Sequence, residues 1–294
     1  MARLTLTVSP EQNGRTVLSL LRGQLGLSTG CIGRIKRAEG GLICNGQRVF
    51  TNHILQSGDV LTVDLSAGET PTNIPPVPMD LDIAFEDEHL LVINKRAPLA
   101  VIPSSLVPTE PTLAAGLMAH LGPSASLHPV NRLDRGTTGL MVVAKNGYIH
   151  DQLRRHLHSG SFFRSYLAVC IGSPKPSCGT ISLSIGRAPG SAIRRQIDPA
   201  GQWARTDYRL LRLKNGLSLV AVTPHTGRTH QIRVHMAAIG CPLAGDWLYG
   251  TEDHSLIPRP ALHAVRLAFT HPLTGDNLSF TAPLPADMKL LLER

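Results

Sequence analysis

The stretch NRLDRGTTGLMVVAK, residues Asn131 to Lys145, joins a charged loop to an apolar run through a Gly-Thr-Thr-Gly turn. The apolar run after the turn is typical of a buried strand. The loop places one carboxylate, Asp134, between Arg132 and Arg135. Taken alone, this string is typical of a surface ion pair at a strand end. The rigid turn and strand also fit a reactive carboxylate that its cationic neighbours keep ionised.

The rest of the chain predicts an α+β fold in two parts. From residue 81 to the end, many short β-rich runs alternate with a few helical stretches, which indicates a mixed, mostly antiparallel sheet flanked by helices. Residues 1–66 predict a small α+β domain with a hairpin around Asn45-Gly46. Between them, residues 67–80 carry four prolines and predict a semi-rigid linker. We therefore expect a second, larger domain over residues 81–294.

Composition limits the classes of partner. The 294 residues carry a formal net charge of +8, which favours a polyanion as partner. Five cysteines without a CxxC pair indicate a reducing compartment, and the N-terminus lacks the apolar segment of a signal peptide. An uncharged stretch, residues 111–131, is interrupted by prolines and histidines, so we expect no membrane span. The expected protein is cytoplasmic and monomeric.

A second dense segment runs from Thr223 to Asp246, where a strand and a turn lead into a helix. Its three histidines are spaced by five residues: His225, His230 and His235. On a helix that spacing separates successive side chains by about 140°, so no shared metal site is expected. Arg228 and Arg233 fit either phosphate or carboxylate binding, or ordinary cations near helix ends.

A third segment, SFFRSYLAVCIG, begins a strand after the basic helical run YIHDQLRRHLHSG. Tyr166 lies two residues after Arg164, so both side chains leave the strand on the same face. The tyrosine fits either a core position or a ring that stacks on a nucleobase. No P-loop, GxGxxG or GxSxG motif is present, so no cofactor is expected.

Read in order, these segments resemble the RluA-type family of RNA pseudouridine synthases. The resemblance covers nearly all of residues 81–290. The matching blocks are IAFEDEHLLVINK, NRLDRGTTGLMVVAK, RSYLAVCIG, TGRTHQIRVHMAAIGCPLAGDWLYG and LHAVRLAFTHPLTGDNLSFTAPLP. Residues 1–66 resemble the small RNA-binding domain of ribosomal small-subunit protein S-four, through RIKRAEGGLICNGQRV and SGDVLTV.

The resemblance implies an isomerase that converts uridine to pseudouridine without a cofactor, metal or second substrate. It makes Asp134 the essential carboxylate, acting either by covalent attack or by removing a ribose proton to form a glycal. Arg233 is expected to pair with this carboxylate, and Arg132 to support the site. Tyr166 is expected to pack on the target uracil and to assist deprotonation at carbon 5.

The resemblance also implies that the target uridine is flipped out of its stack into the site. The residues expected to bind the surrounding RNA are Arg135, Thr138, Arg228, Arg154, Arg155, Arg34, Lys36 and Arg37. Large-subunit ribosomal RNA is the first expected target, and transfer RNA the second. The alternatives are a catalytically silent RNA-binding or ribosome-assembly protein and, third, an enzyme that releases the base without rejoining it.

Several residues depart from the pattern of the family. Asn131 stands where histidine is common, Thr138 where serine is common, and Arg164 where lysine is common. Arg96 and Pro98 also lie in altered positions. Because Asp134, Tyr166 and Arg233 are retained, we expect these changes to affect the choice of RNA site more than the chemistry.

Overall fold

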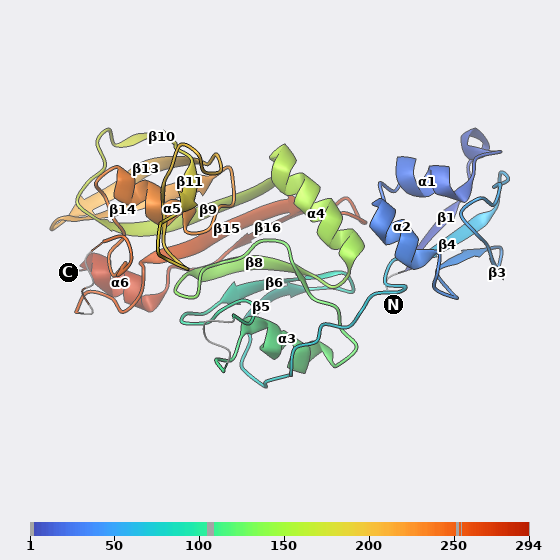
Figure 1. Ribbon diagram of the computed structural model, residues 1–294, viewed down its shortest axis with the longest axis horizontal. Helices are drawn as coiled ribbons and strands as arrows, with labels where there is room; N and C mark the ends of the chain where they lie inside the picture. Colours follow the sequence, from blue (N-terminus) through green and yellow to red (C-terminus); the bar gives the residue numbers. More distant parts are fainter. Residues whose placement is uncertain (1–2, 105–108, 251–252, 254, 294) are drawn as a thin grey trace.

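The protein is described by a computed structural model that covers residues 3–104, 109–250, 253 and 255–293. These residues form a ten-stranded sheet, a four-stranded sheet and a two-stranded ribbon. Figure 1 shows the four-stranded sheet (blue) at one end of the elongated molecule, with the larger sheet filling the remainder. Across the same residues, no helix is long and apolar enough to cross a membrane.

The N-terminal unit packs two short helices against its four-stranded sheet, whose order is β1-β4-β2-β3. The elements are β1 (Arg3–Thr7), α1 (Val17–Gly23), α2 (Thr29–Ile35), β2 (Leu42–Cys44), β3 (Gln47–Arg48) and β4 (Val60–Asp64), with a 3-10 turn at Pro10–Gln12. The predicted hairpin is confirmed, because Asn45 and Gly46 both adopt positive φ angles, 51° and 79°, between β2 and β3. Thr16 and Ser28 cap the two helices through their side-chain oxygens.

The large sheet has the order β10-β13-β14-β9-β15-β8-β6-β5, with β16 added to β15 and β7 added to β8. Its strands are β5 (Ile83–Glu86), β6 (Leu90–Lys95), β7 (His128–Pro129), β8 (Thr138–Ala144), β9 (Phe162–Ile171), β10 (Cys178–Ser182), β13 (Arg205–Lys214), β14 (Leu217–Pro224), β15 (Leu262–Thr270) and β16 (Asn277–Thr281). Among the described strands, β15 and β8 pair in parallel and the other pairs are antiparallel. The predicted mixed, mostly antiparallel α+β fold is confirmed.

Helices cover both faces of the centre of this sheet. The helices are α3 (Leu113–Leu121), α4 (Gly147–Ser159), α5 (Gln231–Ala238) and α6 (Ala286–Glu293), and the ribbon is β11 (Ile185–Arg187) with β12 (Arg195–Ile197). All seven residues of β8 are buried, because Met141 and Val143 pack in the cluster that contains α3 whereas Leu140 and Val142 pack in the cluster that contains α4. This burial on both faces explains the apolar run that follows the Gly-Thr-Thr-Gly turn.

Residues 71–82 contain no helix or strand and run along the surface of the larger unit. The backbone N–H groups of Thr72 and Val77 donate to the carbonyls of Ala125 and Ala115, at 2.9 and 3.0 Å. The N-terminal unit itself contacts α4, where Tyr148 and Gln152 both donate to the Leu25 carbonyl. The segment is therefore tied down by hydrogen bonds, and its division into domain and linker stays a prediction.

Glu69 connects three parts of the chain at this junction. Its carboxylate accepts from the Gly147 N–H at 2.9 Å and from His128 Nε2 at 3.1 Å, and it forms an ion pair with Arg34. Burial alone would raise the pKa of Glu69, but the three partners outweigh it and lower the pKa to about 2. The charged form of Glu69 therefore stabilises the folded chain.

Glu69→Gln is expected to lower the free energy of unfolding by about 3 kcal/mol at neutral pH. The folded pKa is depressed, so the wild type keeps this contribution above the unfolded value of 4.5 and loses it as the pH falls towards about 2. Urea unfolding across this range checks the prediction, with the exposed Glu11→Gln as matched control. Identical pH profiles for wild type and Glu69→Gln would contradict it.

Candidate active site

The loop that carries Asp134 is positioned by a close approach of two strands. Gly139, with φ of 108°, lies opposite Ala264 where β8 pairs with β15. A Cβ at Gly139 would lie 2.3 Å from the Ala264 carbonyl oxygen, so only glycine fits. The preceding turn is closed by the Thr137 N–H, which donates to the Asp134 carbonyl at 3.0 Å. The sequence Gly-Thr-Thr-Gly therefore fixes where the Asp134 backbone leaves the sheet.

The Asp134 side chain is 30% exposed and lines a cavity of about 740 Å³. This volume lies within the range of about 300–1,000 Å³ that is typical of small-ligand sites. The wall comes from residues 100–102, the loop 129–137, one side of α4, the start of β9 and residues 224–233, together with Trp203 and Leu262. Segments far apart in the sequence thus meet around one partly exposed carboxylate.

Arg233 of α5 is the cation beside Asp134, with 3.5 Å between Arg233 Nη1 and Asp134 Oδ2. The other side of the guanidinium is held by Asp246, which accepts from Nε at 2.8 Å and from Nη2 at 2.7 Å. Burial alone would lower the pKa of Arg233, but hydrogen bonding to Asp246 and the charges of both aspartates raise it. A permanently charged, bidentately held arginine therefore faces Asp134.

Asp246 is itself fixed by its own surroundings. Its carboxylate is fully buried and also accepts from the backbone N–H groups of Leu248 and Tyr249, at 3.1 and 3.3 Å. Gly245 before it has φ of 70°, and a Cβ there would lie 2.4 Å from the Arg259 carbonyl oxygen. This partner of Arg233 was missed from the sequence, because the two residues are 13 positions apart and no helical spacing links them.

The arginines that flank Asp134 in sequence do not form its ion pair. Arg135 pairs bidentately with Glu110, at 2.8 and 2.7 Å, and Arg132 is exposed at the cavity wall. The Arg135 guanidinium is therefore directed to Glu110 and away from Asp134. The backbone bends at the turn and directs adjacent side chains apart, so the cation comes from α5.

Tyr166 lies in the cavity wall with 6% of its surface exposed. Burial raises the pKa of its hydroxyl, and the nearby charge of Arg164 opposes this only in part. The phenol is therefore protonated at neutral pH.

Two buried nitrogen donors in the same wall have no hydrogen-bond partner among the described residues. They are Arg164 Nε and Asn131 Nδ2, on side chains that are 9% and 6% exposed. Each side chain is held by its other polar atoms, since Arg164 Nη2 donates to the Thr226 carbonyl and Asn131 Oδ1 accepts from the Val142 N–H. Buried donors normally find acceptors, so these two remain available to acceptor atoms of a ligand.

Lys95 at the end of β6 lies beneath the Asp134 loop, with 2% of its surface exposed. Its ammonium donates to the carbonyls of Leu99, Arg96 and Arg135, at 2.8, 2.9 and 3.4 Å. Burial lowers the pKa of Lys95 to about 7, while the charge of Asp134 opposes the shift. Lysine at the end of an apolar strand was the one sequence signal for this residue.

His230 precedes α5 in a left-handed conformation, with φ of 57°, and lines the cavity. Its Nδ1 lies 2.8 Å from the Tyr249 hydroxyl, which accepts from the Arg195 N–H at 2.8 Å. The tyrosine proton therefore points to Nδ1, and Nε2 carries the imidazole proton. Burial lowers the pKa of His230, so the ring is neutral at neutral pH.

The three histidines of the segment that begins at Thr223 have separate partners. The pairs are His225 Nε2 with Asp207 at 2.6 Å, His230 Nδ1 with Tyr249 at 2.8 Å and His235 Nδ1 with Thr206 at 2.9 Å. Only His235 lies within α5, since His225 is in the turn after β14 and His230 precedes the helix, so the helical spacing does not describe how these side chains are arranged.

The residues predicted to bind RNA do not all lie in the cavity wall of the larger unit. Arg228 and Arg154 line the cavity, whereas Arg155 is exposed on α4 beside Gly26 of the N-terminal unit. Thr138 is buried, and its hydroxyl lies 2.9 Å from His263 Nδ1 between β8 and β15. We correct its assignment from RNA contact to sheet packing, because the first residue of β8 faces the core.

In the N-terminal unit the three residues predicted to bind RNA, Arg34, Lys36 and Arg37, lie in two different places. Arg34 is directed towards Glu69 at the junction with the larger unit. Lys36 and Arg37 line a groove of about 500 Å³ between α1 and α2, together with Arg22. The groove thus presents three cations on one surface of this unit, where they can attract a polyanion.

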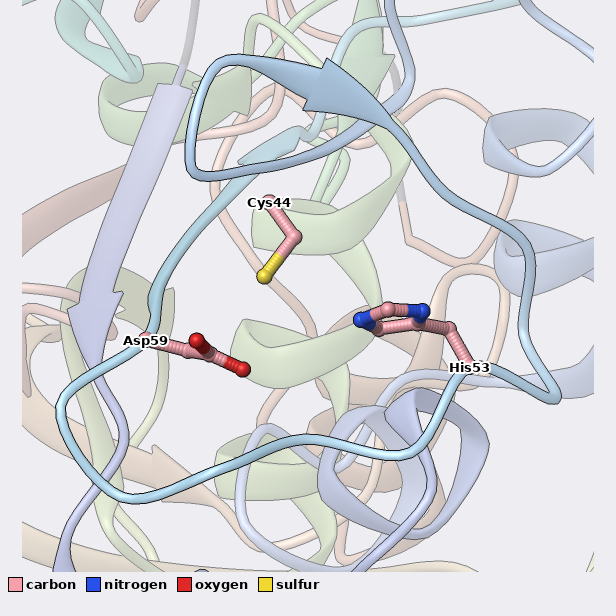
Figure 2. Close-up of side chains that lie close together, drawn as sticks. All are labelled: Cys44, His53 and Asp59. Carbon is pink, nitrogen blue, oxygen red and sulfur yellow. The ribbon is translucent and has the colours of Figure 1, made fainter.

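A separate cluster of Cys44, His53 and Asp59 lies in the N-terminal unit (Figure 2), with one potential ligand atom from each within 4.8 Å of the others. Asp59 already braces the turn, because its oxygens accept from Asn45 Nδ2 and the Gln56 N–H, both at 2.8 Å. Burial and the neighbouring carboxylate raise the pKa of Cys44, which disfavours the thiolate that zinc requires. We assign this cluster a structural role.

Comparison with known proteins identifies the family. Residues 89–238 match the model of the family described as RNA pseudouridylate synthase. The chain is 41% identical over 274 residues to "Uncharacterized RNA pseudouridine synthase YjbO" of Bacillus subtilis (strain 168), covering 92% of this chain and 96% of that protein. It is 38% identical over 270 residues to "Ribosomal large subunit pseudouridine synthase D" of Neisseria meningitidis serogroup A, covering 86% of this chain and 71% of that protein.

A solved structure agrees with this assignment. "Human RNA Pseudouridylate Synthase Domain Containing 1" superposes with a TM-score of 0.58 and 28% sequence identity, covering 71% of this chain and 86% of that one. The chain therefore belongs to the RluA-type family and is an RNA pseudouridine synthase.

Proposed function

We propose that this synthase modifies specific uridines of large-subunit ribosomal RNA and that Asp134 is its essential carboxylate. The observation that carries the catalytic assignment is the geometry of Asp134, partly exposed in the cavity and 3.5 Å from a buried arginine. The target is supported by relatives named for the ribosomal large subunit, which align over 72 to 86% of this chain.

The reaction breaks the bond between ribose carbon 1′ and uracil nitrogen 1, and then joins carbon 5 of the turned base to the ribose. Asp134 acts on the ribose, either by attacking carbon 1′ or by removing a ribose proton. Arg233 fixes the direction of the Asp134 carboxylate, while Asp246 holds the guanidinium in place. The isomerisation is balanced within one nucleotide, because the proton lost from carbon 5 is replaced by one gained at nitrogen 1.

In this proposal the main role of Tyr166 is to pack its ring on the target uracil. Its hydroxyl is protonated at neutral pH, since burial raises its pKa, so it is not a resident phenolate base. The ring instead offers an apolar face for the uracil during its rotation. Deprotonation at carbon 5 then requires the phenol to release its own proton to water as it accepts the proton from carbon 5, and nitrogen 1 takes up a proton from water.

The cationic residues around the cavity are suited to the phosphates next to the flipped uridine. They are Arg132, Arg154, Arg164 and Arg228. The groove between α1 and α2, with Arg22, Lys36 and Arg37, is proposed to hold a more distant part of the same RNA in the manner of the S-four domain. The protein is proposed to act as a cytoplasmic monomer.

Mapping of carbodiimide-marked pseudouridines in total RNA tests the target. A deletion strain is complemented with either the wild-type chain or Asp134→Asn. The proposal expects large-subunit sites that disappear on deletion and return only with the wild type. If pseudouridines are lost only from transfer RNA, then transfer RNA is the target and ribosomal RNA is not. Return of the sites with Asp134→Asn would overturn the catalytic assignment.

A further inference from the structure

Trp203 is an exposed aromatic residue at the edge of the active-site cavity. It lies two residues before β13, lines the cavity and has 54% of its surface exposed. Hydrophobic and aromatic side chains are the usual lining of ligand pockets. The aromatic content of the chain is low, at 4% of residues, so an indole in this place requires an explanation.

The indole is fixed although it is exposed. Its Nε1 donates to the Ser182 hydroxyl at 3.1 Å. The backbone is held on both sides, because Gln202 exchanges two hydrogen bonds with Ile185, at 2.9 and 3.0 Å, and Ala204 is fully buried. An aromatic ring held in this way loses little conformational entropy when a planar ligand stacks on it.

Arg228 binds the same segment and adds a cation. Its Nε donates to the Trp203 carbonyl at 3.1 Å, and its Nη1 donates to Gln202 Oε1 at 3.0 Å. Arg228 also lines the cavity, so an aromatic face and a positive charge lie together on the wall that Asp134 shares. This pairing is the usual chemistry of single-stranded RNA recognition, in which the ring stacks on a base and the arginine contacts the backbone.

We propose that Trp203 and Arg228 form a nucleobase subsite for a nucleotide adjacent to the target uridine. The flipped uridine enters the cavity next to Asp134, and the neighbouring base, left unstacked, lies on the indole. The subsite thereby gives the enzyme a requirement for an unpaired neighbour. This inference rests on the proposed function only for the position of the uridine beside Asp134.

The kinetic test compares Trp203→Leu with Trp247→Leu. Trp247 is also exposed, at 53%, but lies outside the cavity, which makes it a matched control. Tritium release from RNA labelled at uracil carbon 5 is expected to show KM raised about 10-fold in Trp203→Leu, with little change in kcat or in the urea midpoint. Trp203→Phe should recover part of the loss, because it restores an aromatic face.

A binding test separates the subsite from the catalytic assignment. The chain has two tryptophans, so Trp247→Phe leaves Trp203 as the only indole. Emission of Trp203 in this variant is expected to fall when unmodified ribosomal or transfer RNA is added, also in the Asp134→Asn background. RNA that binds by gel shift without changing this emission would overturn the subsite, as would equal KM changes in the two leucine variants. An active Asp134→Asn enzyme with normal quenching would instead overturn only the proposed function.

Discussion

Asp134→Asn is expected to abolish pseudouridine formation, lowering kcat by about 10⁴-fold or more. The amide keeps the size of the side chain but can neither attack ribose carbon 1′ nor accept a ribose proton. RNA binding should survive, because the cations around the cavity are unchanged. Single-turnover tritium release and a parallel gel shift measure the two effects on the same RNA.

Asp134→Asn is also expected to leave the fold intact. Arg233 retains Asp246, which accepts from two guanidinium nitrogens at 2.8 and 2.7 Å, so no buried charge loses its partner. Asp276→Asn, at an exposed aspartate near the β15–β16 turn, is the matched control and should retain full activity. Turnover by Asp134→Asn at the rate of Asp276→Asn would exclude the proposed role of the carboxylate.

Much of the fold was predictable from local pattern. The apolar run after the Gly-Thr-Thr-Gly turn predicts the buried strand β8, and Asn45-Gly46 predicts the hairpin between β2 and β3. The parallel pairing of β8 with β15 was not predictable, because it joins segments more than 120 residues apart. The contacts between residues 71–82 and the larger unit were not predictable either. Prolines indicate that a segment is stiff, but they do not indicate the surface against which it lies.

The candidate site was predictable in its residue types but not in its pairing. The resemblance placed Asp134, Tyr166 and Arg233 together, and the structure brings all three to one cavity wall. The neighbours of Asp134 in sequence do not reveal this pairing, because Arg135 is directed to Glu110. Trp203 was missed because exposure beside a cavity is a tertiary property that no local pattern carries.

Asp134 and Asp246 both contact Arg233 but have different roles. Asp134 is 30% exposed and meets Arg233 through one nitrogen, whereas Asp246 is fully buried and meets it through two. The exposed carboxylate is free to contact substrate, and the buried one neutralises the arginine from behind. Substitutions at the two positions should therefore have different effects on stability.

Asp246→Asn is expected to lower the free energy of unfolding by about 3 kcal/mol and kcat by about 10²-fold. The buried guanidinium of Arg233 loses its compensating charge, and it shifts from the position that orients Asp134. Urea unfolding and single-turnover tritium release measure the two losses.

The matched control for Asp246→Asn is Asp287→Asn. Asp287 binds Arg259 with the same bidentate geometry, at 2.7 and 2.9 Å, but its side chain is 37% exposed, so water replaces part of the lost interaction. A smaller loss of stability and near-normal kcat are therefore expected for the control. If Asp246→Asn kept wild-type stability and activity, the buried ion pair would have no part in holding Arg233 beside Asp134. The orientation of the Asp134 carboxylate would then depend on its own loop alone.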